Sequence, residues 1–280
     1  MRIAHLILAH TNPKQLERLV KKLQHHKADF YIHIDAKTDI EPFCYLEEFN
    51  QVTFIKKREK VFWGAYSIVQ ATINSFEEIL ASEKKYSYIN LLSGQDYPLQ
   101  SAESIYQYLN THQNQAFTEY LLVEDEWHEA ITRLSQYHFT DYKFVGKYFI
   151  ERIIKMISPK RKLPNDLIAV GRSQWFTVAP VHASYIVAYL QNNKKVKRFF
   201  KLTWGSDEII FQTILYNSPF RKDMVNDNLR YIDWSEKQAS PKTLTMQDAD
   251  LLMNSGKLFA RKFNESVDIA ILDYIDSKTQ

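Results

Sequence analysis

The chain has 280 residues, of which 45% are hydrophobic and 25% are charged, and its formal net charge at pH 7 is +3. This composition excludes a disordered or fibrous protein, and the length fits one α/β domain or two smaller domains. The single Cys44 excludes a disulfide framework and a four-cysteine zinc site. The net charge is too small to indicate nucleic-acid binding by itself.

Strand and helix signals alternate in the first third of the chain. Short apolar runs predict buried strands at 3–9, 30–34, 52–55 and 88–92. Between them, periodic apolar positions predict one helix that begins at Asn12-Pro13 and another over 66–80. This alternation predicts an α/β fold with a mainly parallel central sheet flanked by helices.

In parallel sheets of this kind, ligands bind at the carboxyl ends of the strands. The residues expected to follow predicted strands are His10, Asp35, Gly94, Asp96 and Glu119. For Asp35, a contact to a ribose or base and a turn cap after the strand are equally compatible with its position. The sequence therefore indicates a ligand-binding edge without fixing the role of each side chain.

The middle of the chain, residues 124–164, is rich in Tyr, His and Lys and contains a basic stretch at 155–162. We expect a loop or a peripheral helical excursion, whose basic stretch is either a solvated face or a contact to anionic lipid. The charge-free stretch 173–193 is long enough for a membrane span. Its internal polar residues and Pro180 instead favour a strand followed by an amphipathic helix.

The last third contains the most interesting carboxylates. A strand is expected at 173–178, a helix that opens at 205–208, a strand at 231–234 and a helix at 248–254. Ser206 is a good N-cap residue, which would place Asp207 and Glu208 in the first helical turn. Acidic residues there are favoured by the helix dipole alone, but a carboxylate held in this way also suits a general base.

A basic set lies in the last forty residues. Phe259 and Phe263 are expected to anchor this segment in the core and to leave Arg261 and Lys262 partly free. Arginine and lysine side chains bind phosphate, although a solvated basic edge is the commoner situation. The set comprises Lys242, Lys257, Arg261 and Lys262.

Several familiar motifs are missing from the sequence, among them GxGxxG, GxxxxGK[ST], HExxH and GxSxG. An Asp-x-Asp that would hold a divalent metal is not placed at a strand end. The acidic clusters at 124–126 and at Asp248 and Asp250 are either surface charge or the basis of a metal-dependent alternative.

Eight segments in order carry a resemblance to a known family. They read LILAHTNPKQLERLV, YIHIDAKTD, WGAYSIVQATINSF, YINLLSGQDYPLQS, GRSQWFTV, GSDEIIFQTIL, YIDWS and SGKLFARKF, and they run from residue 3 to about residue 264. Together they resemble the core-2/I-branching β-1,6-N-acetylglucosaminyltransferase family, which also contains peptide O-xylosyltransferases. The resemblance implies a GT-A fold and inverting transfer from a UDP-sugar, with no divalent metal and no other cofactor.

The resemblance also implies site residues. Glu208 falls on the family's catalytic base, Asp35 on the uridine-contacting aspartate, and Lys262 on a basic residue that contacts the diphosphate. Lys242 falls near a second such residue, with a somewhat different spacing. The remaining donor-side assignments are His10, Gly94, Asp96 and Arg261, and the remaining substrate-side assignments are Glu119, Arg133, Trp175 and Asp207.

Departures from the family limit what is carried over. The animal members have a membrane anchor and several disulfides, and this sequence shows neither. We therefore expect a bacterial, cytoplasmic enzyme of cell-surface polysaccharide or lipopolysaccharide synthesis, with peripheral contact to the cytoplasmic membrane left open. The expected donor is UDP-GlcNAc, with UDP-xylose and UDP-glucose as alternatives, and the expected acceptor is a glycan or glycolipid.

The whole chain is expected to form one glycosyltransferase domain, with a nucleotide-sugar half at about 1–115 and an acceptor-binding and catalytic half at about 116–280. Two other readings compete with this one: a metal-dependent transferase, and a non-catalytic module that binds a nucleotide sugar or glycan. A nucleic-acid partner is not expected, because no basic groove interleaved with aromatic residues is apparent.

Overall fold

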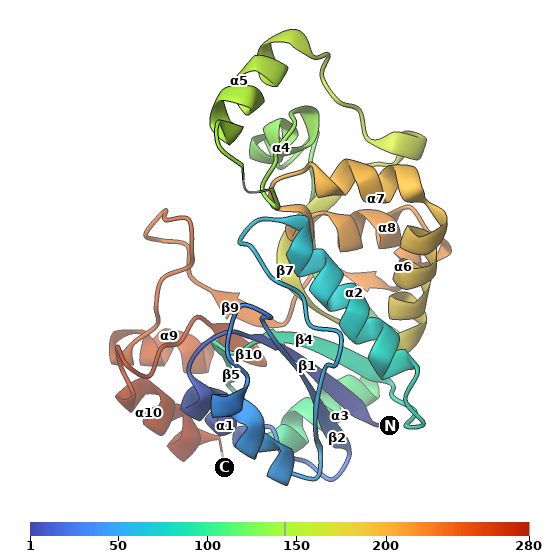
Figure 1. Ribbon diagram of the computed structural model, residues 1–280. Helices are drawn as coiled ribbons and strands as arrows, with labels where there is room; N and C mark the ends of the chain where they lie inside the picture. Colours follow the sequence, from blue (N-terminus) through green and yellow to red (C-terminus); the bar gives the residue numbers. More distant parts are fainter. Residues whose placement is uncertain (143, 280) are drawn as a thin grey trace. The chain divides into compact units, whose positions relative to one another are not determined.

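The computed structural model describes residues 1–142 and 144–279. Its internal contacts divide the chain into two compact units, each assembled from separate segments (Figure 1). Unit 1 contains 1–55, 84–114 and 229–280, and unit 2 contains 56–83 and 115–228. The division into a nucleotide-sugar half and an acceptor half stays a prediction.

Unit 1 is built on four parallel strands. They are β1 (Ile3–Ala9), β2 (Ala28–Ile34), β3 (Val52–Phe54) and β4 (Tyr88–Ser93), in the order β3-β2-β1-β4. Every residue of β2 and β4 is buried, as expected of parallel strands covered on both faces. The α/β class with parallel strands and flanking helices, predicted from the alternating signals, is confirmed.

Helices and a small second sheet complete unit 1. Helix α1 begins after Asn12, whose side chain accepts a hydrogen bond from the backbone N–H of Gln15, as an N-cap should. The second sheet has the order β5-β10-β9. The elements are α1 (Pro13–Lys22), η1 (Glu41–Glu48), β5 (Asp96–Pro98), α3 (Ala102–Thr111), β9 (Arg230–Ile232), η6 (Met246–Asp248), α9 (Ala249–Asn254), β10 (Phe259–Arg261) and α10 (Ala270–Lys278).

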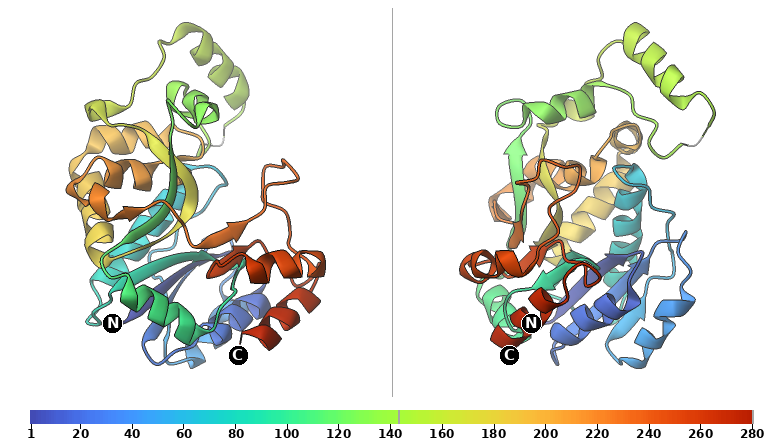
Figure 2. Two further views of the ribbon diagram at one scale, coloured as in Figure 1. Left: turned by 180° about the vertical axis from the view of Figure 1, so that it is seen from behind. Right: turned by 90° about the vertical axis from the view of Figure 1, so that its left-hand side faces the viewer.

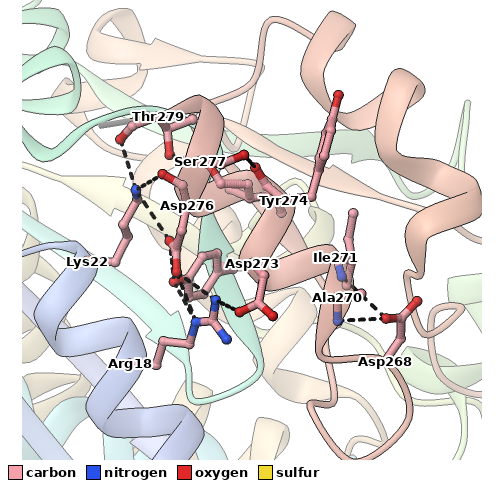
Figure 3. A network of polar contacts seen from close by, with 12 residues as sticks. Arg18, Lys22, Asp268, Ala270, Ile271, Asp273, Tyr274, Asp276, Ser277 and Thr279 are labelled. Carbon is pink, nitrogen blue, oxygen red and sulfur yellow. Dashed lines mark hydrogen bonds and ion pairs between the residues drawn. The ribbon is translucent and has the colours of Figure 1, made fainter.

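Ion pairs attach helix α10 to helix α1. The guanidinium of Arg18 contacts Asp276 at 2.7 Å and Asp273 at 2.6 Å, and the ammonium of Lys22 donates to the carbonyl of Thr279 at 2.9 Å (Figure 3). Tyr97 of β5 joins the network by donating its hydroxyl to Asp276 at 2.8 Å. The last helix therefore belongs to the same unit as the first, although the two lie at opposite ends of the sequence.

Unit 2 contains the strands β7, β6 and β8, which are neighbours in that order. Strand β6 (Ala116–Leu122) pairs with β7 (Val170–Val178) in antiparallel fashion and with β8 (Met224–Val225) in parallel fashion. The β6–β7 register shifts between Thr118 and Tyr120, so Glu119 lies at a bulge inside β6. The prediction that Glu119 follows a strand is therefore wrong. Strand β7 also begins at Val170 rather than at Ser173.

Helices α2, α6 and α8 pack in unit 2 around an aromatic cluster. Phe76 of α2, Phe176 of β7 and Phe211 of α8 are in mutual ring contact, and all three are buried. The elements are α2 (Tyr66–Leu80), η2 (His128–Ala130), α4 (Ile131–Ser135), α5 (Lys147–Ile157), η3 (Pro164–Asp166), α6 (Pro180–Asn192), α7 (Lys194–Lys201), η4 (Ser206–Glu208), α8 (Ile210–Tyr216) and η5 (Pro219–Asp223).

The charge-free stretch 173–193 forms most of β7 and all of α6, as the sequence favours. In the part of the chain that the structure describes, no helix has both the length and the apolar character needed to span a membrane.

Candidate functional site

Three residues predicted to follow strands meet at one edge of the unit 1 sheet. His10 follows β1, Asp35 follows β2 and Gly94 follows β4. The backbone N–H of Asp35 donates to the carbonyl of Ala9, and that of Gly94 donates to the carbonyl of Leu8, each at 2.9 Å. These bonds hold both following segments against the end of β1, at the edge where parallel sheets bind ligands.

The two polar side chains of this group differ in burial. His10 is exposed, whereas Asp35 is buried with 7% of its surface accessible. One carboxylate oxygen of Asp35 accepts the backbone N–H of Lys37 at 2.9 Å, which is the turn cap that the sequence offered as one of two roles. The structure thus shows the cap, and the nucleoside contact stays a prediction.

Asp96 and Arg261 form a buried pair in the second sheet of unit 1. They are register partners of β5 and β10, and the Nε of Arg261 lies 3.4 Å from Oδ1 of Asp96. Burial raises the pKa of Asp96, against the lowering effect of the nearby Arg261 and Arg230 charges. The expectation that Arg261 is partly free is wrong: it is 9% exposed, because β10 turns it toward Asp96.

Two lysines of the C-terminal basic set, Lys242 and Lys262, are less buried than Arg261. Lys242 Nζ lies 2.6 Å from Oδ1 of Asp248, and this hydrogen bond raises the pKa of Lys242. Lys262 is half-buried, and its Nζ lies 3.3 Å from Oγ of Ser240. Backbone bonding also joins the two regions, since the N–H of Leu244 donates to the carbonyl of Lys262 at 2.9 Å.

Glu208 of unit 2 is presented by a tight turn. Gly205 has φ of +65°, a conformation that glycine adopts easily, and the 3₁₀ turn η4 follows directly. The prediction that Ser206 caps the helix is wrong, because Gly205 occupies that position. The Oγ of Ser206 is buried and has no hydrogen-bond partner among the described residues. Glu208 itself remains partly accessible, with 30% of its side chain exposed.

Arg133 holds the Glu208 side chain from a different part of the sequence. Its Nη1 lies 2.5 Å from Oε2 of Glu208. The guanidinium carbon lies 4.3 Å from the ring centroid of Trp204 and 4.9 Å from that of Trp127, both within cation–π range. A Cβ atom on Gly205 would approach Nη1 of Arg133 to 2.8 Å. The lack of a side chain at Gly205 therefore leaves room for the guanidinium.

Sequence patterns alone assign no role to Trp127 or to Trp204. Trp204 had a local signal, since it directly precedes the Gly-Ser-Asp-Glu segment. Trp127 had none, because only the fold brings it to Arg133.

Glu119 and Trp175 are linked through two polar neighbours. The side-chain amide of Asn228 donates to Oε2 of Glu119 at 2.8 Å and to Oγ of Ser173 at 3.1 Å. Ser173 Oγ in turn accepts the backbone N–H of Trp175 at 3.2 Å, and Trp175 is 8% exposed. The structure therefore brings together these two residues, which the resemblance assigns to substrate.

Asp207, the neighbour of Glu208, is buried at 5% exposure, and its Oδ1 has no hydrogen-bond partner among the described residues. Burial, and to a smaller extent the charge of the adjacent Glu208, raise the pKa of Asp207 to about 7. At pH values below about 7 the side chain is then largely neutral, so Glu208 has no second charged carboxylate beside it.

This shift makes Asp207 a source of pH-dependent stability. An unfolded aspartate loses its proton near pH ~3.9, whereas the folded Asp207 keeps it to about pH 7. Between these values the folded state binds more protons, so its stability falls with rising pH by up to about 1.4 kcal/mol per pH unit. We expect Asp207→Asn to remove this contribution. In urea unfolding at pH 4.5 to 7.5, the variant should gain stability relative to wild type as pH rises. A stability difference that stays constant over this range would contradict the assignment.

The acidic residues of the metal-dependent alternative differ in burial. Glu124, Asp125 and Glu126 are exposed, while Asp248 is buried against Lys242 and Asp250 is exposed. Within residues 1–142 and 144–279, no group of three or more His, Cys, Asp or Glu side chains could hold a metal ion.

Comparison with known proteins identifies relatives over nearly the whole chain. The family model described as Core-2/I-Branching enzyme matches residues 3–252. Xylosyltransferase 2 of Rattus norvegicus is 24% identical over 99% of this chain and 33% of its own length. A xylosyltransferase of Ciona intestinalis is 25% identical over 99% of this chain and 34% of its own length. The chain thus spans about a third of the length of these relatives.

Solved structures give a weaker likeness. Mouse xyloside xylosyltransferase 1 in its apo form is 10% identical, with a TM-score of 0.42 and coverage of 92% of this chain and 97% of that one. The galactosyltransferase LgtC, solved with donor and acceptor sugar analogues, is 5% identical, with a TM-score of 0.45 and coverage of 98% and 95%.

Proposed function

Since the chain belongs to the Core-2/I-branching enzyme family, a family of glycosyltransferases, we propose that it is an inverting, metal-independent glycosyltransferase. It moves a sugar from a UDP-sugar to a hydroxyl group of a glycan acceptor. The observation that carries this proposal is the presentation of Glu208. A glycine turn and an ion pair with Arg133 fix its carboxylate, which stays partly accessible.

In the proposed reaction Glu208 is the general base. Its carboxylate takes the proton of the acceptor hydroxyl while that oxygen attacks the anomeric carbon on the face opposite the diphosphate. One glycosidic bond forms as the bond between the anomeric carbon and the diphosphate oxygen breaks, so the configuration inverts. Arg133 binds Oε2 of Glu208 and orients the group. The other oxygen, Oε1, lies outside this ion pair.

The departing UDP carries negative charge that must be stabilised. We assign this role to cations of unit 1, namely Lys262, Lys242 and Arg261. Fixed cations can supply the electrostatic stabilisation that many enzymes obtain from a metal ion. Lys242 and Lys262 are the more accessible, while Arg261 is held against Asp96 and acts from within the sheet.

The donor side of the proposal uses the strand ends of unit 1. His10, Asp35, Gly94 and Asp96 are proposed to contact the nucleotide sugar, with Asp35 at the uridine. The matched relatives named above are called xylosyltransferases, which supports UDP-xylose as a donor alongside UDP-GlcNAc. The acceptor, its pathway in surface-polysaccharide or lipopolysaccharide synthesis and the cytoplasmic location remain predictions from the sequence.

The test is UDP release from UDP-GlcNAc, UDP-xylose and UDP-glucose, each with excess EDTA and, separately, with Mn²⁺. We expect release from one of these donors, because slow hydrolysis often survives without an acceptor, and we expect EDTA to leave the rate unchanged. Release that requires Mn²⁺ would reject the metal-independent mechanism and favour the acidic-cluster alternative. UDP binding in calorimetry without turnover, unaltered in Glu208→Gln, would favour a binding module.

A further inference from the structure

Helix α5 (Lys147–Ile157) exposes a large amount of apolar surface. None of its residues is buried, and the side chains of Phe149, Met156 and Ile157 are 67%, 77% and 75% exposed. In all three views it stands apart from helices α6, α7 and α8 of the same unit (Figures 1 and 2). A contiguous exposed apolar patch on a folded protein commonly marks a binding surface.

Four exposed apolar residues of α5 share one face. With a rotation of about 100° per residue, Phe149, Ile153, Met156 and Ile157 fall on one side of the helix. Glu151 falls on the opposite side, and its Oε1 accepts the backbone N–H of Phe139 at 2.8 Å. The helix is therefore attached by the side that carries Glu151.

Cations border this face. By the same rotation, Arg152 and Lys155 lie between the apolar face and the attached side, and both are exposed. Lys160 and Lys162, just beyond the helix, are exposed as well. Glu151 is the one acidic residue of the α5 sequence, and its carboxylate is engaged with the backbone. The surface next to the apolar face is thus positively charged.

Arg161 belongs to the same basic stretch, but its side chain makes contacts within unit 2. Its guanidinium donates to the carbonyl oxygens of Gln136 at 2.8 Å and Leu202 at 2.6 Å, and it stacks on Phe199 at 3.9 Å. It anchors the segment that follows α5 to the end of α7. We therefore count Arg161 as structural and leave it out of the charged surface.

We propose that α5 is a docking element for a membrane surface rich in anionic phospholipid. An apolar face bordered by lysine and arginine is the pattern of a helix that lies in the plane of a bilayer interface. The cations would contact anionic headgroups while the apolar face enters the acyl boundary. A second copy of this chain fits the surface less well, because it would bring like charges together. This proposal does not depend on the proposed function, since binding is measured without turnover.

The experiment is co-sedimentation of the full chain with large unilamellar vesicles. One set contains phosphatidylcholine with about one third phosphatidylglycerol, and the other contains phosphatidylcholine alone. We expect strong binding to the anionic set and weak binding to the neutral set. An electrostatic contribution of this kind corresponds to about a five-fold change in partitioning for each cation near the surface.

Two groups of variants separate the apolar and charged parts of the surface. Phe149→Ser with Met156→Ser should lower binding to anionic vesicles at least ten-fold, while the exposed Leu251→Ser on α9 should leave it unchanged. Arg152→Gln with Lys155→Gln should lower binding by more than ten-fold. The matched pair Lys56→Gln with Lys85→Gln lies outside this surface and should have a much smaller effect. All of these positions are exposed, so the fold should persist.

Equal binding to both vesicle types, or no binding by the wild-type chain, would overturn the proposal. It would also be overturned if the α5 variants bound vesicles normally. A wild-type dimer in sedimentation velocity that Phe149→Ser with Met156→Ser dissociates, in the absence of vesicle binding, would identify a second copy as the occupant instead.

Discussion

Replacing Glu208 by glutamine is expected to lower kcat for sugar transfer by about 10²–10⁴-fold, the usual contribution of a general base. The amide has nearly the same shape, but it cannot accept the acceptor's proton. Folding should be little affected, since Arg133 retains its stacking contacts with Trp127 and Trp204. UDP release from the active donor gives kcat, and thermal unfolding checks the fold.

Glu129→Gln is the matched control for this substitution. Glu129 is exposed in the turn η2, and the change removes the same charge from the same unit. It should leave kcat within about two-fold of wild type, in keeping with the small effects of exposed charges. UDP affinity, measured by calorimetry, should be preserved in Glu208→Gln, because the proposed nucleotide contacts belong to unit 1. If Glu208→Gln turned over at the wild-type rate, the base would have to be another residue.

Gly171→Ala is the second substitution for which we expect a large effect. Gly171 lies in β7, and a Cβ atom there would be 2.2 Å from the carbonyl oxygen of Glu208 and 2.7 Å from Cα of Ile209. Both neighbours are backbone atoms, so η4 would have to move. Overpacking of this kind costs about 1–3 kcal/mol or more, and a displacement of about 1 Å at a catalytic group can cost about 10²-fold in rate. We expect a lower Tm together with a clearly lower kcat.

Gly256→Ala separates crowding from the backbone cost of losing a glycine. Gly256 has φ of +67°, but no heavy atom would lie within 4 Å of an added Cβ. Its substitution should cost only about 1–2 kcal/mol of conformational energy and should leave kcat unchanged. If Gly171→Ala behaved in the same way, the contact between β7 and the Glu208 turn would not be needed for activity.

Local patterns in the sequence were enough to predict much of unit 1. The largely apolar run at 3–9 became β1, and the apolar periodicity at 66–80, in unit 2, became α2 with the same bounds. Both patterns involve residues that are close together in sequence, so they can be recognised without knowledge of the fold. Helices α3, α7 and α10 were not predicted.

Part of the candidate site could also be predicted from the sequence alone. The sequence alone placed His10, Asp35 and Gly94 at the ends of strands, because a parallel strand can be read from its own residues. It also singled out Glu208 through the Ser-Asp-Glu segment and the family resemblance. These assignments needed only the order of residues along the chain.

Only the tertiary structure decided how these groups are held. Arg133 and Glu208 are 75 residues apart in sequence, and their ion pair forms because packing brings α4 and η4 of unit 2 together. Arg261 was expected to be partly free, yet the pairing of β10 with β5 buries it against Asp96. The burial of a side chain and its partner across the fold depend on the packing of distant segments, which local periodicity does not encode. For the same reason, only the fold reveals that α5 turns its apolar face to solvent.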